Sequence, residues 1–445
     1  MMQTAMTAAA PAPLTRRAGV TLAGAYDGSG YEQPRFLVVR GDGQAIQVTR
    51  VLYEVLAALD GTCDAVAASA AVSSKIGREL TADGLRLLAE QKLRPLGLLD
   101  DPPGVASPAQ AAPVADPLLR VRLHATLLPA RWVPRLGRIF APLFHPVPVV
   151  GVVALLPALD VYLLFHASLS AAMRRVIIEP ADLLALLGVM VVAALFHETG
   201  HAAGCVRGGG RPGAIGVGLY VIFPAFYTDV TDAYRLSRRG RLRTDLGGVY
   251  FSAIAAVCAG VVHVSTGAPV ALVVCLLAQT ELAQQLLPFV RLDGYFVLGD
   301  LIGIPDPFGR VKPILEGMLP GRHIDPQISQ LRRGVRITVT VWVLLVVPLL
   351  APGLALLVWQ LPTIVTATWA SILHQWAAAQ AGWAAGNPFA VILAAVAAAI
   401  AAIPAVGLAF LGYTLLHRAA RWAVNRGRKQ RDTTHQPHPT GDDPP

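Results

Sequence analysis

The chain has 445 residues, of which 54% are hydrophobic and only 15% are charged, and its mean hydropathy is +0.53. A water-soluble globular protein of this size rarely has so apolar a composition, so the balance excludes an ordinary soluble enzyme and indicates an α-helical membrane protein. The formal net charge of +9 does not indicate a nucleic-acid partner, because the arginines flank apolar segments instead of forming one basic surface on a polar domain. We therefore expect membrane lipid, and no nucleic acid, as a partner.

The N-terminal part of the sequence is the least apolar. Residues 1–30 are rich in Ala, Pro, Gly and Thr and lack the continuous apolar stretch of a signal peptide, so we expect a disordered N-terminus that stays in the cytosol. Residues 31–100 contain two strand-like runs, RFLVV (35–39) and AIQVT (45–49), followed by helical periodicity. This pattern predicts a small α/β domain with a winged-helix-like fold in the cytosol.

The remaining sequence divides by composition. The Pro- and Ala-rich residues 101–119 read as a linker, residues 120–418 as a membrane domain, and residues 419–445 as a basic, disordered cytosolic tail. A hydrocarbon core of about 30 Å requires about 20 apolar residues, and about six stretches are long enough. The six predicted spans are 147–167, 183–205, 246–264, 268–287, 337–357 and 388–416.

The placement of arginine predicts the orientation. The loop after the second span and the C-terminal tail are rich in arginine, whereas residues 360–386 contain no Asp, Glu, Lys or Arg. Cytoplasmic loops carry the excess of basic residues, so six spans with both termini in the cytoplasm satisfy this rule, with Arg174 and Arg175 as the exception. We therefore expect a multi-pass protein of the cell membrane, whose oligomeric state the sequence does not indicate.

The second span contains the motif HETGH at 197–201. His-Glu-x-x-His on a helix places His197 and His201 on one face, close enough to share a zinc ion, and leaves Glu198 beside them as a base. Ionisable residues inside an apolar span are costly, which favours a functional role. The structural alternative is a polar patch in which the histidines form hydrogen bonds between helices.

A catalytic zinc ion normally has a third protein ligand, and Asp293 in the sequence RLDGYF is the best candidate. It follows the fourth predicted span, which ends on the same side of the membrane as His201. Gly294 directly after it allows a tight turn. The alternative for Asp293 is an ordinary Asp-Gly turn at the membrane surface.

These two motifs are the basis of a family resemblance. HETGH on one span and LDG after a later one resemble the site-2-protease type of intramembrane zinc metalloprotease. The segment FPAFYTDVTDAYRLSRRGRLRTDLGG (223–248) makes the chain most similar to the peptide zinc metalloprotease branch. The likeness covers residues 120–301 well and the last two spans only in general pattern. It implies that His197, His201 and Asp293 bind Zn²⁺ and that Glu198 is the catalytic base.

One position departs from the family pattern. Relatives of site-2 protease carry an asparagine before LDG that is thought to hold the substrate carbonyl, whereas this chain has Gln285 at that place. Glutamine keeps the amide donor but is longer by one methylene, so an oxyanion role for Gln285 is a weaker expectation than metal binding. Asp229 and Asp232 could contact substrate, but turn and capping roles are more common for such residues.

The N-terminal domain is similar to PqqD-like domains, which recognise the leader segments of ribosomally made peptides. The likeness rests on the hairpin followed by TRVLYEVLAALDGTCDAVAASAA (49–71), and the alternative is a generic winged-helix-like domain. The predicted function is hydrolysis of a peptide bond in a membrane-embedded or membrane-delivered peptide or transmembrane protein. Two rivals remain: a non-catalytic membrane component that binds or exports a ribosomally made modified peptide, and a transporter whose histidines relay protons.

Overall fold

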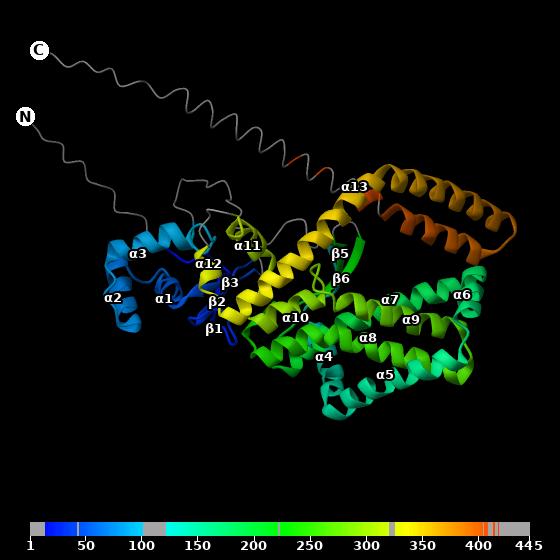
Figure 1. Cartoon of the computed structure of the whole chain (residues 1–445), viewed down its shortest axis with the longest axis horizontal. Helices are drawn as coiled ribbons and strands as arrows, with labels where there is room; N and C mark the ends of the chain where they lie inside the picture. The colour runs from blue at the N-terminus through cyan, green and yellow to red at the C-terminus, as the bar shows by residue number, and fades with distance from the viewer. Residues whose placement is uncertain are drawn as a thin grey trace, which may run out of the picture. The chain divides into compact units, whose positions relative to one another are not determined.

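The computed structural model describes residues 14–41, 44–100, 122–220, 223–319, 325–403, 405–407, 413 and 417 (Figure 1). These residues are mostly helical, as predicted, and they form two small three-stranded sheets. They fall into two compact units. The larger unit holds the described residues within 1–120, 125–217 and 226–356, and the smaller holds those within 121–124, 218–225 and 357–445. The candidate site lies wholly in the larger unit.

The N-terminal module, defined here as the described residues from 14 to 100, combines an antiparallel sheet with three helices. The central strand β2 pairs with β1 on one side and with β3 on the other, so the predicted hairpin is confirmed. The elements are β1 (Thr21–Ala25), β2 (Arg35–Val39), β3 (Ala45–Thr49), α1 (Arg50–Ala58), α2 (Ala65–Ile76), α3 (Ala82–Leu88) and a π-helical turn (Ala89–Leu93).

Capping side chains fix where the helices of this module begin. The Thr49 hydroxyl accepts a hydrogen bond from the Leu52 N–H, and the Asp64 carboxylate accepts one from the Ala67 N–H. Helix α2 ends at Gly77, whose φ of +66° glycine adopts without strain. The apolar faces of the helices then close a core against the sheet. Its fully buried members include Val38, Val55, Leu56, Leu85, Leu93 and Leu98.

The module begins earlier than the sequence predicts. Strand β1 and Val20, which lies in the module core, fall within residues 1–30, so the prediction of disorder is wrong for residues 14–30. The signal was weak because β1 reads TLAGA, with small residues in place of β-branched ones, and its register shifts between Leu22 and Gly24. The predicted linker at 101–119 and the tail at 419–445 lie outside the described residues.

The second part of the chain is a body of helices. Among the described residues, five helices are long and apolar enough to cross a membrane, judged by length and composition. They are Pro146–His166, Ala181–Arg207, Arg238–Thr266, Arg333–Leu350 and Pro388–Gly407. The helices of the body are α4 (Val133–Phe140), α5 (Pro146–His166), α6 (Leu169–Ile178), α7 (Pro180–Arg207), α8 (Arg238–Thr266), α9 (Pro269–Gln285), α10 (Asp293–Ile302), α11 (Val311–Gly317), α12 (Pro326–Ser329) and α13 (Arg333–Ala384), with 3-10 turns at Ala141–Phe144, Thr231–Arg235 and Phe308–Arg310.

Two predicted spans differ from the observed helices. The stretch 268–287 forms α9, which has only 17 residues and whose last two turns carry Gln279, Glu281 and Gln285. It falls short of the roughly 20 apolar residues that a span needs, which accounts for five spans instead of six. The fifth span does not end near 357. Helix α13 continues to Ala384 through an Ala-rich sequence that favours helix, so the expected loop at 360–386 is largely helical.

A second sheet lies between α7 and α8 along the chain. The apolar segment after α7 contributes β5 (Ile215–Tyr220) and β6 (Phe223–Thr228). The strand order is β4-β5-β6, with β4 at Arg122–Leu128. This hairpin leads from the end of α7 back toward the start of α8, and its last residue enters the candidate site.

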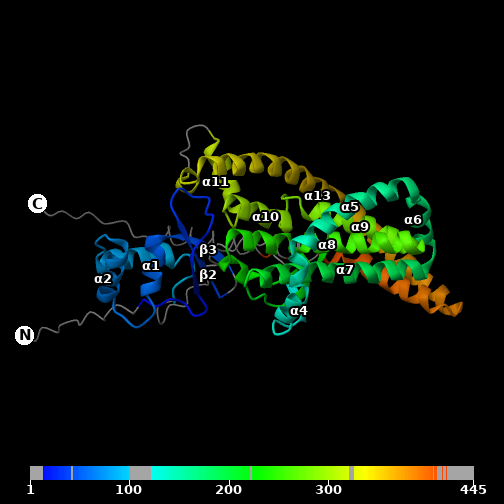
Figure 2. The ribbon, with the colours of Figure 1, turned by 90° about the horizontal axis from the view of Figure 1, so that it is seen from below.

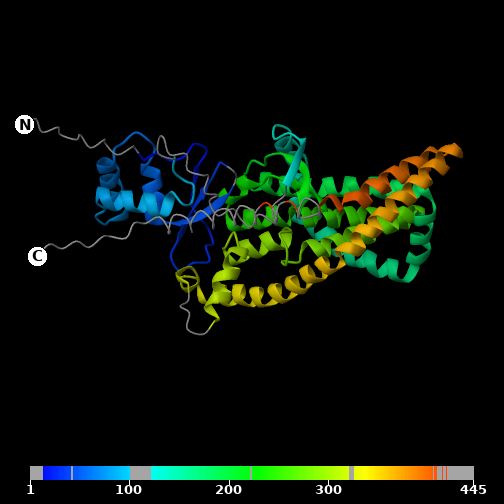
Figure 3. The same ribbon diagram turned by 90° about the horizontal axis from the view of Figure 1, so that it is seen from above.

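Helices α7, α8 and α9 lie side by side (Figures 1 and 3). Glycines let the backbones of α7 and α8 touch. A Cβ atom added at Gly200 would lie 2.2 Å from the carbonyl oxygen of Gly247, and one added at Gly204 would lie 2.6 Å from that of Arg243. Small residues at such contacts permit close packing of membrane helices. The contact brings the face of α7 that carries the HETGH motif directly against α8.

The N-terminal module and the body share a core. Tyr31, in the connection between β1 and β2, is buried in a cluster with Tyr295 and Ile302 of α10 and with Val339 and Trp342 of α13. Figure 2 shows β2 and β3 beside α8 and α10, with α1 and α2 on the far side of the sheet. The module is therefore built into the larger unit instead of hanging from a linker.

Candidate metal centre

The two histidines of the HETGH motif lie side by side on α7, as the sequence predicts. His197 is 3% exposed and His201 is 9% exposed. Their Nε2 atoms are 3.2 Å apart, which follows from their separation by one helical turn. Both imidazoles therefore present the same ring nitrogen to one buried point.

Asp293 completes this group. It is the first residue of α10, and its carboxylate oxygens lie 3.3 Å from Nε2 of His197 and 3.4 Å from Nε2 of His201. Among the described residues, these three side chains are the group of His, Cys, Asp or Glu ligands that could hold a metal ion, with ligand atoms all within 4.8 Å of one another. The prediction that Asp293 approaches the histidines is confirmed.

The connection from α9 to α10 aims this carboxylate. A Cβ atom at Gly294 would lie 2.2 Å from the carbonyl oxygen of Leu286 and 3.0 Å from that of Gln285. Glycine is thus required here for the close approach of two backbone segments, and not for the turn with positive φ that the Asp-Gly sequence suggested. The close contact holds the start of α10 against the end of α9.

The outer nitrogens of the histidines are held by α8. Nδ1 of His201 lies 2.9 Å from the carbonyl oxygen of Thr244, which can only accept, so this nitrogen carries a proton, and in the neutral imidazole Nε2 is left with the lone pair. Nδ1 of His197 lies 2.9 Å from the hydroxyl of Ser252. Such partners fix the orientation and the tautomer of metal-binding histidines.

Gly248 of α8 faces the point where the three ligands converge. A Cβ atom at this position would lie 2.3 Å from Nε2 of His197 and 2.4 Å from Nε2 of His201. Any side chain here would therefore press on both ligand nitrogens. The absence of a side chain at Gly248 leaves the lone pairs of the histidines accessible.

The electrostatics favour a cation. Oδ2 of Asp293 is buried and accepts no hydrogen bond from a described residue. Burial raises the pKa of this carboxyl, but the facing imidazoles of His201 and His197 lower it further, so the pKa of Asp293 lies below its usual range and the group is ionised. A buried carboxylate that faces two converging imidazole nitrogens is an environment that a bound cation stabilises.

Glu198 is buried beside the ligands and is held by the hairpin. The hydroxyl of Thr228, the last residue of β6, lies 2.7 Å from Oε2 of Glu198 and 2.9 Å from its backbone oxygen. The contact orients the carboxylate that the sequence predicts as a base. Sequence reasoning missed Thr228, because nothing local marks its approach from 30 residues away.

Two further residues lie around this centre. Glu281 of α9 interacts electrostatically with His197, Asp293 and Glu198, and it has no hydrogen-bond or ion-pair partner among the described residues. Gln285, the predicted oxyanion donor, ends α9 and is half-buried. Its side chain makes no hydrogen bond to another described residue, so its role remains a prediction.

Asp229 and Asp232 have structural roles, as favoured from the sequence. Asp229 accepts a hydrogen bond from the Thr231 N–H at 3.0 Å, and Asp232 accepts one from the Arg211 N–H at 2.8 Å. Both side chains therefore stabilise the turns around the hairpin. Neither joins the group of ligands.

No protein-family model, curated protein or solved structure matches the chain. The functional argument rests on the geometry of the centre. Buried ligands, oriented by α8, surround a point beside a buried carboxylate, and this arrangement can bind a metal ion next to a base.

Proposed function

We propose that this chain is an intramembrane zinc metalloprotease. The observation that carries the proposal is the convergence of three ligands: Nε2 of His197 and Nε2 of His201 lie 3.2 Å apart, Oδ2 of Asp293 lies 3.3 Å from the first, and Oδ1 of Asp293 lies 3.4 Å from the second. A tetrahedral zinc ion with ligands at about 2.0–2.1 Å keeps its ligand atoms roughly 3.3 Å apart. Three protein ligands with a fourth position left over are typical of catalytic rather than structural zinc sites.

The donor set supports zinc over calcium and magnesium. Two imidazoles with one carboxylate suit zinc, whereas calcium and magnesium prefer oxygen ligands alone. The ion would be held by Nε2 of His197, Nε2 of His201 and the carboxylate of Asp293. The Thr244 carbonyl and the Ser252 hydroxyl would keep both imidazoles in place.

The chain's own residues then account for the proton transfers. When bound, zinc supplies a Lewis acid that polarises a carbonyl and lowers the pKa of water. Glu198 accepts the proton of the attacking water and returns it to the leaving amine. Because Thr228 holds one carboxylate oxygen at 2.7 Å, the other oxygen is left for the proton. The reaction is hydrolysis of a peptide bond.

The setting of this chemistry is the membrane. The ligand-bearing helix α7 is one of the five apolar helices, and its motif stands in the C-terminal half of the helix. The arginines that follow it, among them Arg207 and Arg211, favour a cytoplasmic location for this end and for both termini. The substrate is a membrane-embedded or membrane-delivered peptide, which must unwind locally because a helix engages its own carbonyl groups.

The test combines metal content with cleavage by the full-length protein in detergent micelles. We expect about one zinc per chain, retained in Glu198→Gln and lost in His197→Ala. A mixed-sequence library of quenched fluorescent peptides should be cleaved by the wild type and not by Glu198→Gln. Cleavage that survives Glu198→Gln, or a wild type without zinc, would contradict the proposal.

One observation favours a second candidate, a non-catalytic membrane component that binds a ribosomally made modified peptide. Gln285 replaces the expected asparagine and makes no hydrogen bond to a described residue. Under this alternative the wild type holds zinc but cleaves no peptide of the library, while it retains peptides at the same level as Glu198→Gln. Cleavage by the wild type decides against it.

A further inference from the structure

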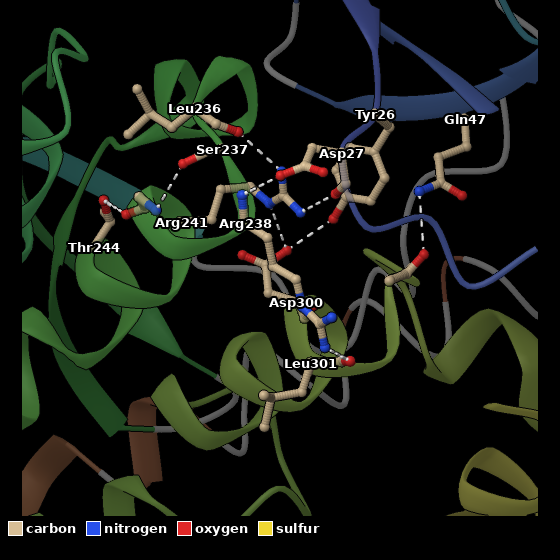
Figure 4. A network of polar contacts seen from close by, with 12 residues as sticks. Tyr26, Asp27, Gln47, Leu236, Ser237, Arg238, Arg241, Thr244, Asp300 and Leu301 are labelled. Carbon is tan, nitrogen blue, oxygen red and sulfur yellow. Dashed lines mark hydrogen bonds and ion pairs between the residues drawn. The ribbon is translucent and has the colours of Figure 1, made fainter. Parts of the chain in front are cut away.

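A second buried polar cluster joins the N-terminal module to the helices of the metal centre (Figure 4). It consists of Tyr26 and Asp27 from the connection that follows β1, Arg238 and Arg241 from the start of α8, and Asp300 from α10. Arg241 is 1% exposed, Tyr26 is 5% exposed and Asp300 is 6% exposed. Charged groups so deeply buried must find their partners within the protein.

Asp300 is the centre of this network. Its Oδ1 atom accepts hydrogen bonds from the Tyr26 hydroxyl at 2.8 Å and from Nε of Arg241 at 2.9 Å. Burial and the Asp300 carboxylate raise the pKa of Tyr26 far above its usual range, so the phenol stays a donor. The carboxylate is thus held from two sides, by α8 and by the module.

Asp27 joins the module to the first turn of α8. Its backbone oxygen accepts a hydrogen bond from Arg241 at 2.8 Å, and its carboxylate accepts one from the Arg238 N–H at 3.0 Å. The guanidinium of Arg241 also lies 4.1 Å from the centroid of the Tyr26 ring. Removing the module would therefore leave Arg241 with part of its hydrogen bonding unsatisfied.

The backbones of the module and of the end of α10 are in direct contact at this junction, so neither can slide along the other. A Cβ atom at Gly303 would lie 2.0 Å from the carbonyl oxygen of Gly28, and one at Gly30 would lie 2.2 Å from that of Ile302. The Gly30 N–H donates to the Gly303 oxygen at 3.0 Å. The module thus holds the C-terminal end of α10 directly.

Helical periodicity connects this network to the metal centre. Arg241 precedes Gly248 on α8 by seven residues, and Asp293 precedes Asp300 on α10 by seven residues. Seven residues are nearly two turns, so the members of each pair lie on one face of their helix. Arg241 binds Asp300, and Gly248 lies against the histidines that face Asp293. The contact between Arg241 and Asp300 therefore sets the register of α10 along α8.

We propose that Tyr26, Arg241 and Asp300 are positioning residues for the metal centre. The N-terminal module completes the Arg241–Asp300 pair, and this pair places the carboxylate of Asp293 against His197 and His201. The inference rests on the proposed function in that the third ligand must bind a metal. It adds that the module is part of the metal site, although it supplies no ligand.

The test is metal affinity and coordination geometry in the full-length protein in detergent micelles. Zinc affinity is measured by competition with a chelator, and coordination by the visible spectrum of the cobalt-substituted protein. We expect Asp300→Asn to weaken zinc binding roughly tenfold or more, and Tyr26→Phe to weaken it a few-fold. Losses of this size are typical when groups that orient metal ligands are removed. Both variants should also change the cobalt spectrum.

Tyr31→Phe is the matched control. Tyr31 is also 5% exposed and also links the module to the body, since its hydroxyl accepts a hydrogen bond from Arg310 at 2.7 Å. Arg310, however, precedes α11 and touches neither α8 nor α10 through this contact. Tyr31→Phe should therefore keep the zinc affinity and cobalt spectrum of the wild type.

The possible outcomes separate the two proposals. A wild type that binds neither zinc nor cobalt contradicts the proposed function. A wild type that binds both, with Tyr26→Phe and Asp300→Asn indistinguishable from it, overturns the positioning role. Should Asp300→Asn not fold, Tyr26→Phe decides the question, because it keeps the ion pair and the aromatic ring. Equal loss in Tyr26→Phe and Tyr31→Phe also overturns it, because that result indicates general loosening.

Discussion

Two buried clusters lie between α8 and α10, and they differ in how their charges are balanced. In the network of the N-terminal module, the Asp300 carboxylate is paired with a guanidinium from the same chain, that of Arg241. In the metal centre, the Asp293 carboxylate faces two imidazoles, and its Oδ2 atom accepts no hydrogen bond from a described residue. The first cluster contains a permanently charged guanidinium, whereas the second contains imidazoles, whose charge depends on protonation, and could hold a metal ion. Helices α8 and α10 thus contribute to one structural cluster and, together with α7, to one cluster that could hold a metal ion.

The largest effect is expected when the cluster that contains the Arg241 guanidinium is disrupted. Arg241→Ala leaves the buried Asp300 carboxylate without its charged partner, which should cost about 3–5 kcal/mol of unfolding free energy. Asp293→Asn in metal-free protein should cost less, because the Asp293 carboxylate faces two imidazoles and not a guanidinium. Thermal and denaturant unfolding in detergent measure both. Equal losses of stability in the two variants would contradict this difference in how the two clusters balance their charges.

The next effect concerns the space for the ion. Gly248→Ala places a methyl carbon 2.3 Å from Nε2 of His197 and 2.4 Å from Nε2 of His201, which is too close for contact, so the imidazoles must move. Such overpacking typically costs about 1–3 kcal/mol, which corresponds to a loss of zinc affinity of roughly tenfold to 100-fold. Gly188→Ala is the control, since a Cβ atom at that position of α7 meets nothing within 4 Å. Unchanged affinity in Gly248→Ala would place the ion elsewhere.

A similar or smaller loss is expected at the outer hydrogen bond of His197. Ser252→Ala removes the hydroxyl that lies 2.9 Å from Nδ1, and zinc affinity should fall by roughly tenfold or somewhat more. Ser252→Thr keeps a hydroxyl and should retain more of the affinity. Chelator competition measures the series. An effect on peptide cleavage alone, with zinc affinity preserved, would count against Ser252 as a partner of a ligand.

The smallest expected effect separates the base from the ligands. Thr228→Val keeps the shape of the side chain but removes the donor to Glu198, and kcat should fall roughly tenfold while zinc content stays at the wild-type level. Thr228→Ser should recover most of the rate. Steady-state cleavage of the peptide library and metal analysis provide the two readouts. Loss of zinc in Thr228→Val would show that the hairpin supports the ligands as well.

The parts of the centre that the sequence predicts follow from short-range rules. His197, Glu198 and His201 belong to one helical turn, so their spacing alone determines which side chains meet. Predicting the place of Asp293 required one further inference, namely the direction in which a later helix crosses the membrane. Ser252, Gly248 and Thr228 contribute through contacts between α7, α8 and β6, and a single sequence contains no signal for which serine or glycine faces a histidine.

The fold shows the same limit. The hairpin of β2 and β3 and the apolar helices were predictable from alternation and from long apolar runs. The length of α9 was not, because an apolar run does not reveal where polar side chains find partners within a bundle. Nor was the docking of the N-terminal module, because Tyr26 and Asp300 are separated by most of the chain. An arginine in the first turns of an apolar helix, Arg241, was the sequence feature that could have indicated a charged partner.

The contact between the backbones at Gly200 and Gly247 also limits how molecules can approach the candidate metal centre. Where two helices meet without side chains between them, neither a lipid tail nor a polypeptide can pass through the seam, because both are wider than the contact. The ligand nitrogens of His197 and His201 belong to α7 and lie against Gly248 of α8, close to this contact. The contact between α7 and α8 therefore closes one approach to the candidate metal centre.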